Sequence, residues 1–94
     1  MAWKVGWSQR AQSQRKAIFE YWNQHNQSYA YSEKLDRYIN DTINVLKEYP
    51  YLGRKTEHAN VYVRIILNFQ LYYKVRGNEI TILGIRDGRR APKK

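Results

Sequence analysis

The sequence predicts an α+β domain: a short N-terminal strand, an α-helical hairpin and a three-stranded antiparallel meander, with the helices packed on one face of the sheet. Three observations lead to this prediction. A short aromatic and β-branched run opens the chain, apolar residues then recur at helical spacing as far as Pro50, and alternation replaces that spacing afterwards. Because the helices come early and most of the strands come late, this order implies the α+β class.

The first strand is expected at 3–7, where two tryptophans flank Lys4, Val5 and Gly6. Ser8 is a suitable N-cap for a helix that runs to about His25. The apolar positions of this helix recur at helical spacing: Ala11, Ile18, Trp22 and His25, with Phe19 and Tyr21 widening the stripe.

The second helix has the strongest periodicity in the chain. A polar connection at 23–28 precedes it, and Pro50 ends it. Two helices joined so closely are expected to form a hairpin that shares one apolar face. We expect that face to include Tyr31, Leu35, Tyr38, Ile39, Thr42, Val45, Leu46 and Tyr49.

Three strands are expected after Pro50. The first covers 61–67, the second covers 69–76, and Gly77-Asn78 forms a two-residue turn into a third at 80–85. The third strand is apolar on both faces, which favours an interior position, and the N-terminal strand must pair with one of the three. The face away from the helices is expected to be cationic and aromatic, with Tyr62, Arg64, Gln70, Tyr72, Lys74 and Arg76.

Charge is distributed unevenly along the chain. Seventeen Lys and Arg against eight Asp and Glu give a formal net charge of +9. Residues 1–50 hold seven basic and five acidic side chains, whereas residues 51–94 hold ten and three. The second half therefore presents a cationic surface, which suits a nucleic acid, a ribosome or an acidic protein segment.

Composition also excludes several classes of site. Cysteine is absent and only His25 and His58 could contribute imidazoles, so we expect no metal site and no cofactor. No apolar run approaches the length of a membrane span. We expect one cytoplasmic domain over 1–94, with 88–94 forming a flexible basic tail.

The order of motifs resembles the RelE/ParE toxin superfamily of type II toxin–antitoxin modules. The resemblance covers the chain from Val5 to Pro92. It rests on a strand ending in Trp-Ser, a helical hairpin, Pro50 followed by Gly53-Arg54, Val-x-Val-Arg at 61–64, Tyr72-Tyr73, and a last strand that runs into Arg-Arg-x-Pro at 89–92.

The resemblance implies a bacterial growth inhibitor that is neutralised by a cognate antitoxin. Antitoxins of this superfamily are typically acidic and partly disordered when free, which suits a strongly basic toxin. RelE-like members cleave mRNA in the ribosomal A site, whereas ParE-like members poison DNA gyrase without nuclease activity.

Cations for the nuclease chemistry are present. Cleavage through the 2′-hydroxyl needs positive charge at the phosphorane, and Arg64, Arg86 and Arg90 lie on or just after strands. The resemblance places Arg64 and Arg90 where RelE-like nucleases carry functional arginines. Further basic residues are expected to bind nucleic acid or a partner: Arg54, Lys55, Lys74, Arg76, Arg89, Lys93 and Lys94.

An acid and a base are harder to assign. RelE-like nucleases commonly carry a Tyr or His after the last strand, and 87–94 contains neither. The substitutes are His58, Tyr72 and Tyr73; Tyr73 alternates with apolar residues and fits the core better. Glu57 and His58 would point to opposite faces if they lay on a strand.

The absence of a Tyr or His after the last strand favours a ParE-like toxin that is not a nuclease. A RelE-like mRNA endonuclease is the alternative. A non-catalytic nucleic-acid-binding module ranks third, because one sheet face is expected to be basic and aromatic. A fourth possibility is an inactive relative that still binds its antitoxin.

Overall fold

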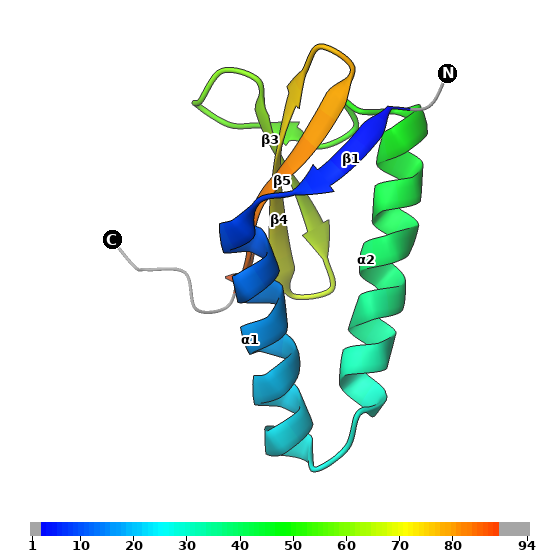
Figure 1. The fold of residues 1–94 in the computed structure, drawn as a ribbon, viewed down its shortest axis with the longest axis vertical. Helices are drawn as coiled ribbons and strands as arrows, with labels where there is room; N and C mark the ends of the chain where they lie inside the picture. The colour runs from blue at the N-terminus through cyan, green and yellow to red at the C-terminus, as the bar shows by residue number, and fades with distance from the viewer. Residues whose placement is uncertain (1–2, 89–94) are drawn as a thin grey trace.

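The computed structural model describes residues 3–88, in which two helices pack against a mixed five-stranded sheet (Figure 1). The order of elements agrees with the predicted α+β fold, except for one additional short strand. The elements are β1 (Lys4–Trp7), α1 (Gln9–Asn26), α2 (Ala30–Glu48), β2 (Arg54–Lys55), β3 (Val61–Ile66), β4 (Phe69–Arg76) and β5 (Glu79–Asp87).

The strands lie in the order β1-β5-β4-β3-β2. Strands β3, β4 and β5 form the predicted antiparallel meander, and β5 is interior, as its apolar character indicated. Strand β1 pairs in parallel with β5, with Lys4 opposite Glu79. Strand β2 was not predicted: its two residues pair with Tyr62 and Val63 of β3, and a two-residue strand has no periodicity to detect.

Helix α1 begins at the predicted cap, where the Ser8 hydroxyl accepts a hydrogen bond of 3.0 Å from the amide of Ala11. The pairing of β1 with β5 stops at Ile82, and α1 then passes the uncovered edge of β5. There the Gln14 side-chain oxygen accepts the Ile85 amide at 2.9 Å. A helix side chain thus replaces a neighbouring strand as hydrogen-bond partner.

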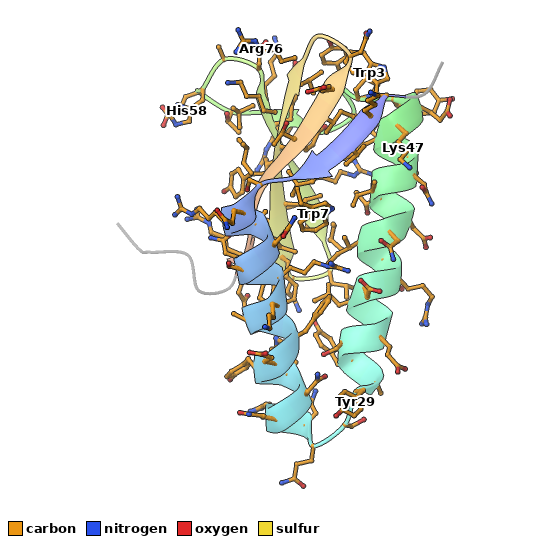
Figure 2. The ribbon with its side chains drawn as sticks, in the orientation of Figure 1. Trp3, Trp7, Tyr29, Lys47, His58 and Arg76 are labelled. Atoms are coloured by element: carbon orange, nitrogen blue, oxygen red, sulfur yellow. The ribbon has the colours of Figure 1, made fainter. Side chains whose placement is uncertain are left out.

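Helix α2 buries a different stripe from the predicted one. Its buried residues are Ser32, Leu35, Ile39, Ile43 and Leu46. Three members of the predicted stripe, Tyr38, Val45 and Tyr49, are exposed. The predicted stripe also omitted the buried Ser32 and Ile43; apolar residues cover more than the arc that one helix buries, so their spacing did not define that arc. The backbone carbonyl of Lys47 near the end of α2 accepts the amide of Trp3 at 3.2 Å, and the two residues lie together in Figure 2.

The outward face of β3 differs from the prediction. Tyr62 and Ile66 belong to the buried core, whereas Ile65 is 56% exposed. Arg64 lies opposite the buried Leu71, so it belongs to the helix-side face and not to the open one. In the run 61–67, the residues on both faces are apolar except for Arg64. Alternation alone therefore could not show which face of the strand meets the helices.

The turn after β3 also differs from the predicted boundary. Leu67 was expected in the strand, but Ile66 pairs with Phe69, which leaves Leu67 and Asn68 as a two-residue turn. Leu67 adopts a left-handed φ of 55° there. The predicted turn at Gly77 is confirmed, with a φ of 60°.

Tyr73 of β4 is fully buried at the centre of the core. Its hydroxyl accepts a 2.8 Å hydrogen bond from the amide of Gly53, and its ring stacks on Tyr62 with centroids 5.7 Å apart. A β-carbon on Gly53 would lie only 2.5 Å from the Tyr73 hydroxyl oxygen. This close approach therefore requires glycine at position 53. Burial also raises the pKa of the Tyr73 phenol.

Candidate functional site

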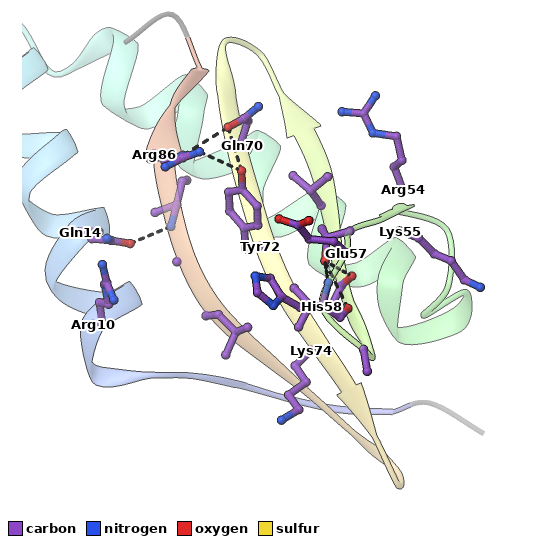
Figure 3. A pocket seen from close by; sticks show the side chains of 17 residues that line it. Arg10, Gln14, Arg54, Lys55, Glu57, His58, Gln70, Tyr72, Lys74 and Arg86 are labelled. Carbon is purple, nitrogen blue, oxygen red and sulfur yellow. Dashed lines mark hydrogen bonds between the residues drawn. The ribbon is translucent and has the colours of Figure 1, made fainter. Parts of the chain in front are cut away.

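An open groove of about 940 Å³ lies on the sheet face that is turned away from the core (Figure 3). Side chains of the three central strands form its floor. The segment 54–59 forms one wall, and Arg10 and Gln14 of α1 form the other. We call this feature the open-face groove; its floor includes Val61, Val63, Gln70, Tyr72, Lys74, Leu83 and Gly84.

Strand β4 supplies the centre of the floor because its residues alternate strictly. Leu71, Tyr73 and Val75 are buried under the helices, so Gln70, Tyr72 and Lys74 point into the groove. The prediction for these three positions is confirmed. Next to β4, a register irregularity at Leu83 shifts the pairing so that Tyr72 lies opposite Gly84.

Tyr72, Arg86 and Gln70 form a hydrogen-bonded cluster on this floor. The Tyr72 hydroxyl donates to the Gln70 side-chain oxygen at 3.1 Å and accepts from the Arg86 guanidinium at 3.3 Å. The guanidinium carbon lies 5.4 Å from the centre of the Tyr72 ring. The cluster therefore holds a cation and an aromatic ring in one defined arrangement.

The wall at 54–59 is held by a compact loop between β2 and β3. The Thr56 hydroxyl donates to the carbonyl of Val61 at 2.9 Å and accepts the His58 amide at 3.1 Å. Glu57 and His58 are therefore loop residues, and both line the groove (Figure 3). The expectation of opposite faces held only for a strand, so it does not apply to these two loop residues.

Five cationic side chains line the groove against one carboxylate, that of Glu57. Within residues 3–88, none of the five forms an ion pair. The five cations are Arg10, Arg54, Lys55, Lys74 and Arg86. Arg10 was not among the predicted site residues, because its place beside the sheet depends on how the first helix packs against β5.

Comparisons with known proteins agree with this fold. A sequence model described as the ParE toxin of the type II toxin-antitoxin system, parDE, matches residues 5–92. The chain belongs to the ParE toxin family. The predicted superfamily is therefore confirmed, as is the preference for its ParE branch. As a ParE toxin of a parDE system, the protein has a cognate ParD antitoxin as its partner.

A solved structure described as the chromosomal ParDE TA system from P. aeruginosa resembles this ParE toxin in fold. Its matching chain has a TM-score of 0.76 and 21% sequence identity, and the alignment covers 92% of this chain and 96% of the other. A comparison with curated protein sequences gives no match.

The ParE fold brings some of the predicted site residues together and separates others. Arg86, Tyr72 and His58 share the open-face groove with Lys55 and the other groove cations. Arg64 and Tyr73 do not line it: Arg64 borders a smaller hollow beside Leu52 and Ile65, and Tyr73 is in the core.

The remaining predicted basic residues lie elsewhere. Arg76 is exposed at the end of β4 and lies outside the groove lining. Four predicted residues fall outside the described part of the chain: Arg89, Arg90, Lys93 and Lys94.

In the described range 3–88, no three His, Cys, Asp or Glu side chains lie close enough to hold a metal ion. Neither α1 nor α2 is long and apolar enough to cross a membrane.

Proposed function

We propose that this ParE toxin stops growth in the cytoplasm by acting on DNA gyrase, and that it does not cut nucleic acid. Membership of the ParE family supports the target. The absence of nuclease activity is supported by the surroundings of the two tyrosine hydroxyl groups that were candidates for the acid or the base. Tyr73 is buried, and the Tyr72 hydroxyl already donates to Gln70 and accepts from Arg86.

General acid–base cleavage needs two groups that can reach a substrate and exchange protons. Arg64, which was expected to stabilise the phosphorane, is on the helix-side face of the sheet and does not line the groove. Among residues 3–88, the groove therefore gathers positive charge but assembles little of the machinery that RNA cleavage requires.

The test is a supercoiling assay with purified gyrase, relaxed plasmid and the toxin, with and without an equimolar amount of its ParD antitoxin. We expect inhibition by the free toxin and recovery when ParD is added. Expression in a bacterial host, followed by primer extension on abundant mRNAs, should show intact transcripts together with damaged nucleoids.

Ribosome-dependent mRNA cleavage is the second candidate. One observation favours it: His58, Tyr72 and Arg86 line the same groove. Cleavage within codons during expression, with gyrase unaffected in vitro, would replace the gyrase proposal. In that case His58→Ala should abolish cleavage, because it removes the exposed imidazole.

We also propose that the ParD segment that covers this toxin is acidic and partly disordered when free. The support is the formal charge of +9, which lies mostly in the second half of the sequence. Association of the two proteins should slow as salt is raised; an association rate independent of salt would contradict an electrostatically steered encounter.

A further inference from the structure

The cations of the open-face groove converge on one surface from separate parts of the chain. Arg10 comes from α1, Arg54 and Lys55 from β2, and Lys74 and Arg86 from β4 and β5. In Figure 3, Arg10 lies on one side of the floor and Lys55 on the other. Because no carboxylate pairs with them within residues 3–88, their charge is available to a ligand.

Arg10 occupies a position that helix electrostatics disfavours. It lies in the first turn of α1, which contains no acidic residue. The amino end of a helix carries partial positive charge, so a carboxylate there is stabilising and a guanidinium is not. Arg10 therefore weakens its own helix, and residues that break a local rule in this way concentrate at functional surfaces.

The floor of the groove is narrower than a DNA duplex. Its floor spans β3, β4 and β5, and strands about 4.8 Å apart give a floor of about 10 Å. The major groove of a DNA duplex alone is about 12 Å wide, so a complete duplex is too broad to enter.

The floor also offers flat and apolar surfaces to bases. Val61, Val63 and Leu83 supply apolar contacts, and the Tyr72 ring with the Arg86 guanidinium over it supplies planar groups. Bases stack on aromatic rings and on guanidinium planes without sequence preference, while cations beside the rings follow the phosphates.

We infer that the open-face groove binds one strand of nucleic acid directly, with bases on the Tyr72–Arg86 floor and phosphates on the five cations. This inference deepens the proposed function, since a toxin that acts on DNA gyrase works next to DNA. The binding itself needs no gyrase, so it can be tested alone.

The experiment measures fluorescence anisotropy of labelled oligothymidylate and oligouridylate of about 12 nucleotides, within the range of small strand-binding domains. The toxin is freed from ParD and titrated at several salt concentrations. Each phosphate contact contributes about −0.7 to the slope of log K against log salt, so five contacts give about −3.5. Equal binding of both oligomers indicates a general strand site, whereas tighter oligouridylate binding indicates contacts to the 2′-hydroxyl.

Single variants separate the cationic contacts from the stacking contact. Arg10→Ala and Lys74→Ala should each make the slope less steep by about 0.7. Arg37→Ala is the matched control, because Arg37 is an exposed cation on α2 outside the groove, and its slope should equal that of the original protein. Tyr72→Ala should weaken binding about ten-fold with little change in slope, and Tyr72→Phe should restore it.

Three results would overturn the inference. The first is absence of binding at low salt by a toxin that still inhibits gyrase, which would leave the proposed function intact. The second is a loss of slope in Arg37→Ala as large as that in Lys74→Ala. The third is weaker ParD binding by the groove variants with unchanged oligonucleotide binding, which would assign the groove to the antitoxin. Strand binding without gyrase inhibition would instead contradict the gyrase proposal alone.

Discussion

The two faces of the sheet are formed by alternate residues of the same strands, yet one face is buried and the other is open. The helix-side face of β4 is sealed, and Leu71 and Tyr73 have no exposed surface. The face one residue away carries Tyr72 and Lys74 in an open groove. The first face supplies buried core contacts and the second carries the groove proposed to bind a ligand, so substitutions on the two faces should have separable effects.

Two arginines of α1 show the same division. Arg15 forms an ion pair with Asp36 of α2, and its guanidinium lies over the rings of Trp7 and Phe19 at 5.1 and 5.2 Å. Arg10 is exposed and, within the described residues, has no carboxylate partner. One arginine is part of the packing between the helices, and the other is available to a partner.

The largest expected effect is a difference in the free energy of unfolding between Leu71→Ala and Lys74→Ala, which alter opposite faces of β4. Leu71→Ala removes a fully buried side chain and should lower the free energy of unfolding by about 2–5 kcal/mol. Lys74→Ala, three residues away on the same strand, should change it by no more than about 0.5 kcal/mol. Urea denaturation of both variants measures this difference, and similar losses would show that the open face also carries stability.

The contact between Gly53 and Tyr73 gives the next largest effect. Gly53→Ala should cost about 1–3 kcal/mol, because its new methyl group meets the Tyr73 hydroxyl and the Val63 carbonyl. Tyr73→Phe should also destabilise, because it leaves the Gly53 amide without its partner. The double variant should lose less than the sum of the two, and strict additivity in a denaturation cycle would contradict the close approach.

The smallest effect is a loss of stability at alkaline pH. Burial raises the pKa of Tyr73 above its ordinary value near 10. The unfolded chain therefore loses this proton first, so the stabilisation is complete below about pH 10 and declines as pH rises towards the folded pKa. Between pH 9 and 11 the urea midpoint should fall more in the original protein than in Tyr73→Phe; equal declines would mean that other groups are responsible.

The sequence predicted most of the fold because most signals were local. Ser8 caps α1 through its own side chain, and Gly77 permits the turn that joins β4 to β5. The strict alternation of β4 correctly separated Leu71 and Tyr73 from Tyr72 and Lys74.

The orientation of β3 could not be predicted, because it depends on pairing. Both alternating sets of positions on β3 carry apolar residues: Val61, Tyr62, Val63, Ile65 and Ile66. Only the turn into β4 decides which of them enter the core. Similarly, the apolar residues of α2 did not reveal which arc would meet the sheet.

Part of the site was also beyond the reach of sequence patterns. Arg10 joins the groove because α1 passes the edge of β5, which is a tertiary contact with no local signature. By contrast, Tyr72 and Lys74 were predicted from their position on an alternating strand, and Arg86 was predicted from its place just after the last expected strand. The strict alternation of β4 predicted the centre of the floor, whereas the rest of the floor and the walls depend on how the elements pair and pack.

The parallel pairing of β1 with β5 has a consequence for how the chain folds. Lys4 pairs with Glu79, and the Ser8 hydroxyl donates to the carbonyl of Leu83, 75 positions along the chain. Contacts of such high sequence separation raise the contact order and slow folding, because a long loop must close before they form. A nascent chain cannot complete its sheet until β5 has been synthesised, so a ParE toxin interrupted before that strand lacks both its closed core and its groove.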